Sequence, residues 1–123
     1  MIAATKRDLT RDAPAIDLVH LARQSDGDEA LEAELLAMFD SQAAKLAARL
    51  DRPDVGVQAK ADMAHRLKGS ALAIGAWRVA DAATATETHF AKIAAGGSSD
   101  DEPLVELQDA VDEARAVIAR LTA

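Results

Sequence analysis

The chain of 123 residues contains no cysteine and no tyrosine, and only 2% of its residues are aromatic. Without cysteine there is no disulfide framework, thiolate zinc site or cysteine nucleophile. No run of about 18 apolar residues is present to cross a bilayer, and the N-terminal residues lack the apolar stretch of a signal peptide. We therefore expect a cytoplasmic protein that is not associated with a membrane.

Basic residues are in the minority, and the formal net charge is −7. Nucleic-acid binding is not expected, because phosphate neutralisation needs a basic stripe and base stacking needs aromatics. Within residues 56–80, however, the net charge is positive, because this segment has four cations and one anion. These residues are Lys60, Arg66, Lys68, Arg78 and Asp62. We call the four cations the basic island.

Apolar residues recur at spacings of three and four along four segments, which is the periodicity of amphipathic helices. The segments cover about 31–50, 55–74, 76–95 and 104–121. The stripes expected to be buried are Leu31, Leu35, Phe39, Ala43, Leu46 and Leu50; Val57, Ala61, Ala64, Leu67, Ala71 and Ile74; Ala76, Val79, Ala83, Thr86, Phe90 and Ile93; and Leu104, Leu107, Val111, Ala114, Ile118 and Leu121.

Local signals mark the helix ends. Either Ser25 or Asp26 is expected to cap the first long helix, and Gly75 to end the second in the left-handed conformation. Thr86 interrupts the third stripe, and its hydroxyl is expected to bond back to the preceding turn. A short additional helix is predicted up to Arg23.

These patterns predict an all-α fold, an antiparallel up-down four-helix bundle with a short additional N-terminal helix at one end. We expect residues 1–14 to form a flexible N-terminal arm and residues 15–123 to form the bundle domain. Four apolar seams in one chain can close a core without a partner, so a monomer is expected.

The segment from Ala64 to Ser70 places a histidine beside a cation and a glycine. His65, Lys68 and Gly69 share one helical face because residues three and four positions apart are neighbours. At about 100° per residue, His65 flanks the buried Ala64 at the edge of the core. A neutral imidazole keeps a lone pair for nucleophilic attack, and a lysine one turn away can compensate phosphoryl charge. The arrangement suits the handling of a phosphoryl group.

Gly69 costs about 1 kcal/mol relative to alanine in a helix interior. Its position beside the histidine suggests that space is needed there for a partner to approach. Asp62 and Leu72 extend the same stripe along the edge of the buried face.

At these residues the sequence resembles the histidine-containing phosphotransfer (Hpt) domain family. The family's signature is a helical His-x-x-Lys-Gly followed six residues later by another glycine, represented here by His65, Lys68, Gly69 and Gly75. The Leu35–Phe39 segment is similar to the helix that precedes the family's phosphorylation helix. The resemblance covers roughly residues 27–95.

The resemblance implies a phosphorelay intermediate of two-component signal transduction, a phosphoprotein without ATP-dependent kinase activity of its own. His65 would take a phosphoryl group from the aspartyl phosphate of one response-regulator receiver domain and pass it to the aspartate of another, and Lys68 would compensate the charge. Implied partners are receiver domains and a hybrid histidine kinase. The chain itself would need no cofactor and hold no metal, since Mg²⁺ would come from the receiver. The residues expected to contact the partner are Asp62, Arg66, Gly69, Leu72 and Arg78.

Two other functions compete with this interpretation. A helical-bundle adaptor would dock receivers without relaying phosphate, although such a protein would not need both His65 and Lys68. The dimerising helix pair of a sensor kinase usually carries an acidic residue after its histidine, where this chain has Arg66. His20 and His89 are interpreted as surface histidines, and Trp77 as either a cap on the core or an exposed anchor, with the cap favoured.

Overall fold

The computed structural model describes residues 14–98 and 100–123. The predicted N-terminal arm lies outside the described residues except for Pro14, as does Ser99 in the predicted connector. The described part of the chain is helical and contains no strand. Its helices are α2 (Leu18–Gln24), α3 (Glu29–Leu50), α4 (Val57–Ile74), α5 (Trp77–Ala94) and α6 (Glu102–Leu121).

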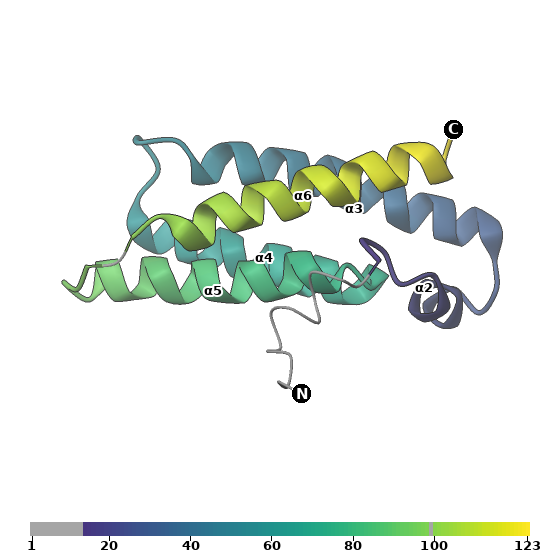
Figure 1. Cartoon of the computed structure of the whole chain (residues 1–123), viewed down its shortest axis with the longest axis horizontal. Coiled ribbons are helices and arrows are strands. Elements are labelled where there is room, and N and C mark those ends of the chain that lie inside the picture. Colours follow the sequence, from purple (N-terminus) through teal and green to yellow (C-terminus); the bar gives the residue numbers. More distant parts are fainter. Residues whose placement is uncertain (1–13, 99) are drawn as a thin grey trace, which may run out of the picture.

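Helices α3 to α6 form a closed ring in which each helix packs against two others. Helix α4 contacts α3 and α5, and α6 contacts α5 and α3, with successive helices running in opposite directions (Figure 1). The short α2 contacts α4 at one end of the bundle. The predicted four-helix bundle with an additional N-terminal helix is therefore confirmed. None of the described helices is long and apolar enough to cross a membrane.

Small residues line the centre of this bundle. Ala43, Ala64, Ala71, Ala83 and Ala114 expose none of their surface. Because the distance between helix axes depends on the side chains at the contact, these alanines allow the helices to approach closely. The core therefore closes with very few aromatic side chains.

The residues of the predicted apolar stripes are buried in the middle of each helix, but two of them are exposed at the ends of the bundle. Leu31 and Leu121 were expected inside, but they are 37% and 45% exposed. Leu31 lies in the first turn of α3 and Leu121 is the last residue of α6, so the ring does not enclose either side chain. Leu36 and Met63 are buried in addition to the predicted residues.

The predicted caps of the first long helix were wrong. Ser25 ends α2, where it is buried, and Asp26 and Gly27 take positive φ values of 54° and 78° to redirect the chain. The cap therefore moves to Asp28, whose carboxylate accepts a hydrogen bond from the backbone N–H of Leu31 at 3.1 Å. Two left-handed residues in succession separate the helices.

Gly75 ends α4 as predicted, with φ of 78° in the left-handed region. Its carbonyl accepts a hydrogen bond from the backbone N–H of Asp17 at 2.9 Å. The Asp17 carboxylate accepts a second one from the indole N–H of Trp77, also at 2.9 Å. Trp77 is half-buried and packs edge-on against His20, which confirms the predicted cap. These contacts attach the segment before α2 to the α4–α5 turn.

Two polar residues of α5 are buried. Thr86 bonds back to the carbonyl of Ala82 at 2.9 Å, as predicted, and also lies 3.1 Å from the carbonyl of Pro103. His89 was expected at the surface, but only 2% of it is exposed. The ring lies edge-on to Phe90, and its Nε2 is 3.5 Å from a carboxylate oxygen of Asp101. The error arose because the segment after α5 and the start of α6 cover this end of α5, which local periodicity does not reveal.

Candidate functional site

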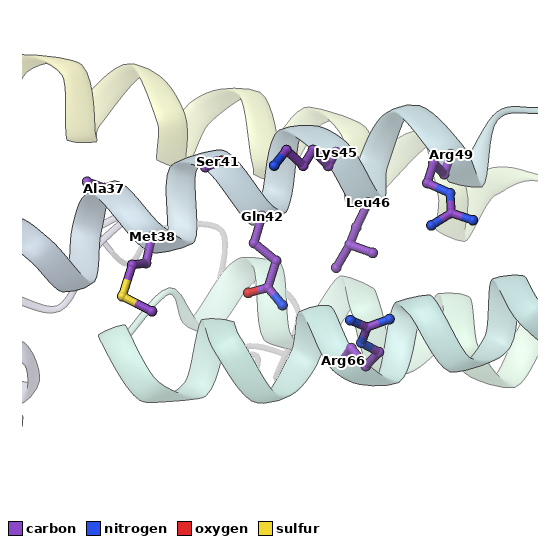
Figure 2. Close-up of a pocket in the computed structure, with 8 residues that line it drawn as sticks. All are labelled: Ala37, Met38, Ser41, Gln42, Lys45, Leu46, Arg49 and Arg66. Atoms are coloured by element: carbon purple, nitrogen blue, oxygen red, sulfur yellow. The ribbon is translucent and has the colours of Figure 1, made fainter.

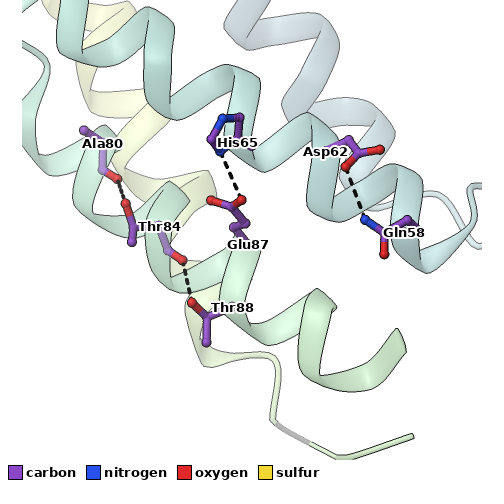
Figure 3. A network of polar contacts seen from close by, with 7 residues as sticks. All are labelled: Gln58, Asp62, His65, Ala80, Thr84, Glu87 and Thr88. Atoms are coloured by element: carbon purple, nitrogen blue, oxygen red, sulfur yellow. Dashed lines mark hydrogen bonds and ion pairs between the residues drawn. The ribbon is translucent and has the colours of Figure 1, made fainter. Parts of the chain in front are cut away.

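His65 lies on the outer side of α4, next to α5. Its side chain is 66% exposed, so it flanks the core without entering it, as predicted. Its Nδ1 is 3.0 Å from Oε2 of Glu87, a carboxylate carried by α5 (Figure 3). The imidazole is therefore positioned by the neighbouring helix and is still open to solvent.

The partner of Nδ1 determines which ring nitrogen can react. An ionised carboxylate only accepts hydrogen bonds, so the neutral ring must carry its proton on Nδ1 and donate it to Glu87. The lone pair is then on Nε2. This geometry presents a nucleophilic nitrogen to solvent on a ring held by a second helix.

Lys68 and Gly69 follow one turn further along α4. Lys68 is half-buried, and Gly69 is exposed. A Cβ added to Gly69 would meet no atom within 4 Å, so packing inside the chain does not require glycine here. The absence of a side chain instead leaves the surface beside His65 open.

A family comparison covers the helices that carry this site. The model of the Hpt domain family matches residues 29–117, from the start of α3 into α6. The chain belongs to the Hpt domain family. A crystal structure of the histidine phosphotransferase ShpA from Caulobacter crescentus is similar to this Hpt domain, with 30% identity and a TM-score of 0.64. The match covers 87% of this chain and 89% of that chain. No curated protein matches the sequence.

Membership identifies the class of activity. The chain is a phosphotransfer protein of two-component signalling, a class whose members act as intermediates and interact with receiver domains and histidine kinases. Which atoms carry the phosphoryl group is a separate question, and the geometry of this Hpt domain bears on it.

The Hpt fold places most of the other predicted partner-binding residues on one surface and turns Arg78 away from it. Asp62, Arg66 and Leu72 are exposed on the outer side of α4 with His65. The Asp62 carboxylate accepts a hydrogen bond from the side-chain amide of Gln58 at 3.2 Å (Figure 3). The Leu72 side chain is 43% exposed. These residues form one surface around Gly69.

Arg78 is not part of that surface. It lies nine positions before Glu87, which at about 100° per residue is the opposite side of α5. Its guanidinium pairs with the carboxylate of Glu113 on α6. Lys60, also in the basic island, sits 5.5 Å from the centre of the Phe90 ring. Of the four cations of the basic island, Arg66 and Lys68 are the two that lie within one turn of His65 on α4.

Glu87 is the site residue that the sequence prediction missed. It has no local motif, because its role depends on pairing with a histidine 22 positions away. A signal did exist in the hairpin geometry: His65 lies eleven residues before Ala76, and Glu87 lies eleven residues after it. In two antiparallel helices joined by a tight turn, positions equally far from the turn lie opposite each other along the helix axes.

Two threonines flank Glu87 on α5. The hydroxyl of Thr84 donates to the carbonyl of Ala80 at 2.9 Å, and that of Thr88 donates to the carbonyl of Thr84 at 3.2 Å (Figure 3). Their hydroxyl protons are used within the helix, so the edge of the site on α5 is polar and uncharged apart from Glu87. Across residues 14–98 and 100–123, no group of three or more potential ligands could hold a metal ion.

Proposed function

We propose that His65 is the phosphorylated residue of this Hpt protein. It would accept a phosphoryl group from the aspartyl phosphate of one receiver domain and pass it to the aspartate of another. The observation that carries the proposal is the 3.0 Å contact between Nδ1 of His65 and Glu87 on an exposed ring, which leaves Nε2 open to solvent. The family membership supports the reaction class.

In the proposed step, Nε2 attacks the phosphorus in line with the bond to the receiver's carboxylate oxygen. The N–P bond forms as that P–O bond breaks, and the aspartate leaves with the electron pair. The ring keeps its Nδ1 proton and becomes positively charged. The Glu87 carboxylate then stabilises that charge through the same hydrogen bond. The reverse sequence returns the phosphoryl group to a receiver.

Lys68 and Gly69 would assist from the next turn of α4. A phosphoryl group on His65 brings about two negative charges, which the Lys68 ammonium can compensate. Gly69 lets the partner's active-site backbone approach the ring. We propose that Mg²⁺ belongs to the receiver and that this chain uses no nucleotide, so positioning and charge compensation supply the catalysis.

The other two histidines are poorly placed for the reaction. Nε2 of His20 is 2.9 Å from the backbone carbonyl of Leu72, to which it can donate. His89 is 2% exposed. The His20 ring is held by the end of α4, and the buried His89 ring is closed to a receiver's aspartyl phosphate.

The test is to incubate the protein with a receiver domain carrying radiolabelled aspartyl phosphate. We expect label that is stable in base and labile in acid, abolished by His65→Ala and retained by His20→Gln. Equal label on His65→Ala would refute the assignment. Stable receiver binding by the wild type without any transferred label would instead establish the non-catalytic adaptor. Gel filtration of the same sample tests the proposal that the closed bundle acts as a monomer.

A further inference from the structure

His89 is a buried titratable side chain that the proposed reaction does not use. It lies on α5, its side chain is 1% exposed, and neither ring nitrogen has a hydrogen-bond partner among the described residues. A buried polar group without a partner loses its hydrogen bonds to water and gains none in return. The folded chain therefore holds this ring at a cost in stability.

Other polar side chains between the helices do have partners. Gln42 lines the groove between α3 and α4 shown in Figure 2, and it accepts a hydrogen bond from the hydroxyl of Ser70 at 2.5 Å. The buried Thr86 donates its hydroxyl to the carbonyl of Ala82 at 2.9 Å. Within residues 14–98 and 100–123, His89 is the side chain whose buried nitrogen atoms lack such a bond.

The start of α6 covers the ring. The Thr86 hydroxyl, one turn before His89 on α5, lies 3.1 Å from the carbonyl of Pro103 in the first turn of α6. Nε2 of His89 lies 3.5 Å from a carboxylate oxygen of Asp101, the residue directly before α6. A movement of the first turn of α6 away from α5 would therefore expose the ring to water.

The hydrogen bonds at the start of α6 are local. The Asp100 carboxylate accepts from the backbone N–H of Glu102 at 3.0 Å, and the carbonyl of Asp101 accepts from the backbone N–H of Val105 at 3.1 Å. Neither bond joins α6 to α5. A helix end that loses its packing is marginal in water, so a detached first turn would also unwind.

Charged groups lie on every element around His89, because α5 packs against α4 and α6. They are Asp101, Glu102 and Glu106 at the start of α6, Lys60 on α4 and Lys92 one turn further along α5. Asp101 is the one in contact with the ring, and its side chain is 84% exposed. Nζ of Lys60 is 5.5 Å from the centre of the Phe90 ring, against which His89 packs edge-on.

A proton on the buried ring would meet more cost than compensation. An ion pair with an exposed carboxylate contributes little, because water screens the charges. Burying a cation without a close, desolvated partner costs much more than such a pair returns. Lys60 adds a second positive charge on the other side of Phe90. A ring exposed to water keeps its proton with full hydration, so protonation favours the open arrangement.

We propose that His89 makes the packing of α6 on α5 sensitive to acid: when the ring takes up a proton, the first turns of α6 detach and expose it. The closed state holds the neutral ring, and the open state binds one proton more. Closure is therefore strongest above about pH 6.5, where an exposed imidazole is neutral, and it weakens as the pH falls below that value. The release does not depend on the proposed phosphotransfer, because Glu87 lies on the opposite side of α5.

The experiment measures amide hydrogen exchange by NMR at pH 7.5 and pH 5.5. Each exchange rate is divided by the intrinsic rate at the same pH to give an opening constant. For Val105 and Leu107, in the first two turns of α6, we expect this constant to be about tenfold higher at pH 5.5, because one proton is taken up on opening. Leu67, in the middle of α4, should change little. No rise at Val105 and Leu107, or an equal rise at Leu67, would overturn a local release.

Two histidine variants test whether His89 is the group responsible. His89→Leu cannot take up a proton and should show the same opening constant at both pH values. His20→Gln removes a different histidine and should keep the tenfold rise. The measured quantity is the ratio between the two pH values, so a packing defect that acts equally at both leaves it unchanged. A tenfold rise that persists in His89→Leu would overturn the proposal.

A third variant distinguishes release from its opposite. An ion pair between a protonated His89 and Asp101 would fasten α6 in acid. Asp101→Asn removes the negative charge and keeps a residue suited to the N-cap. We expect the tenfold rise to remain in this variant. An opening constant that falls in acid in the wild type, and no longer falls in Asp101→Asn, would establish the fastening ion pair and overturn the release.

Discussion

Glu87 on α5 holds the ring of His65 on α4, with 3.0 Å between the carboxylate oxygen and Nδ1. The carboxylate is one-third exposed and the imidazole is two-thirds exposed, so the pair lies at the surface. In the proposed reaction, one helix therefore supplies the nucleophile and its neighbour supplies the group that orients it. This division means that the reactivity of His65 depends on the packing of α4 against α5.

Replacing Glu87 should slow phosphotransfer without unfolding the protein. Glu87→Ala removes the acceptor and the negative charge, and we expect a loss of about tenfold in transfer rate, the lower range for a hydrogen bond to a charged group at a partly exposed site. Glu87→Gln can still accept from Nδ1 and should lose less. Rates from a phosphorylated receiver measure the effect, and Thr88→Ala, one residue along α5, is the control. A Glu87→Ala protein as fast as the wild type would show that the contact is not used.

Lys68 should affect the reaction more than the fold. Lys68→Ala removes the cation nearest in sequence to His65 on its helical face, and we expect transfer to slow about tenfold, because roughly 1.4 kcal/mol of charge compensation corresponds to that factor. Circular dichroism should show unchanged helicity, and Lys92→Ala provides a control for loss of one positive charge. A large fall in melting temperature for Lys68→Ala would make this residue structural instead.

The two glycines of the motif should respond in opposite directions to alanine. Gly69→Ala meets no atom within 4 Å and should stabilise the helix by up to about 1 kcal/mol. Gly75 has a φ of 78°, and a Cβ there would lie 2.9 Å from the Cβ of Asp17. Gly75→Ala should therefore destabilise the protein by more than about 1 kcal/mol. Urea denaturation measures both changes.

A large side chain at Gly69 tests whether the open surface serves a partner. Gly69→Leu should fold normally and bind a receiver more weakly, while phosphoramidate labelling of His65 continues. Receiver affinity equal to that of the wild type would contradict the argument that this space admits the partner.

Asp17 should make stability depend on pH in the acid range. The backbone N–H of His20 and the indole N–H of Trp77 both donate to its carboxylate, and they hold its pKa below the ordinary value of 3.8. A carboxyl group whose pKa is lower in the folded state stabilises that state above the unfolded pKa. This contribution is lost as the pH falls through the lower, folded value.

The measurement is melting temperature against pH for the wild type and Asp17→Asn. The wild type should be more stable above about pH 5, and the difference should shrink as the pH falls below about 4. Asp112→Asn, at an exposed position on α6, should show no such trend. A difference between wild type and Asp17→Asn that stays constant from pH 6 to 3 would contradict the role of the carboxylate.

The helices were predictable because each carries its own signals. Apolar spacing of three and four identified α3 to α6, and the glycine after Ile74 identified the end of α4. Predictions failed where a neighbour from elsewhere in the chain decided the outcome. Buried His89 is covered near the start of α6, and exposed Leu31 and Leu121 lie where the bundle stops covering them. Local periodicity contains no information on either.

The candidate site divides in the same way. His65, Lys68 and Gly69 could be placed on one face because they are within two turns of one helix. Glu87 could not be assigned, and Arg78 was grouped with the site although its helix turns it towards Glu113. Proximity in sequence predicts proximity in space only within one helix.

The sequence by itself determined the helical periodicity, the left-handed end of α4 and the short motif that contains His65. These depend on interactions between residues a few positions apart. Only the tertiary structure decided which ring nitrogen of His65 is held, by bringing Glu87 against it, and that Arg78 pairs with Glu113 away from the site. Those features depend on the side-by-side packing of helices, where the contacts join residues that are distant in the chain.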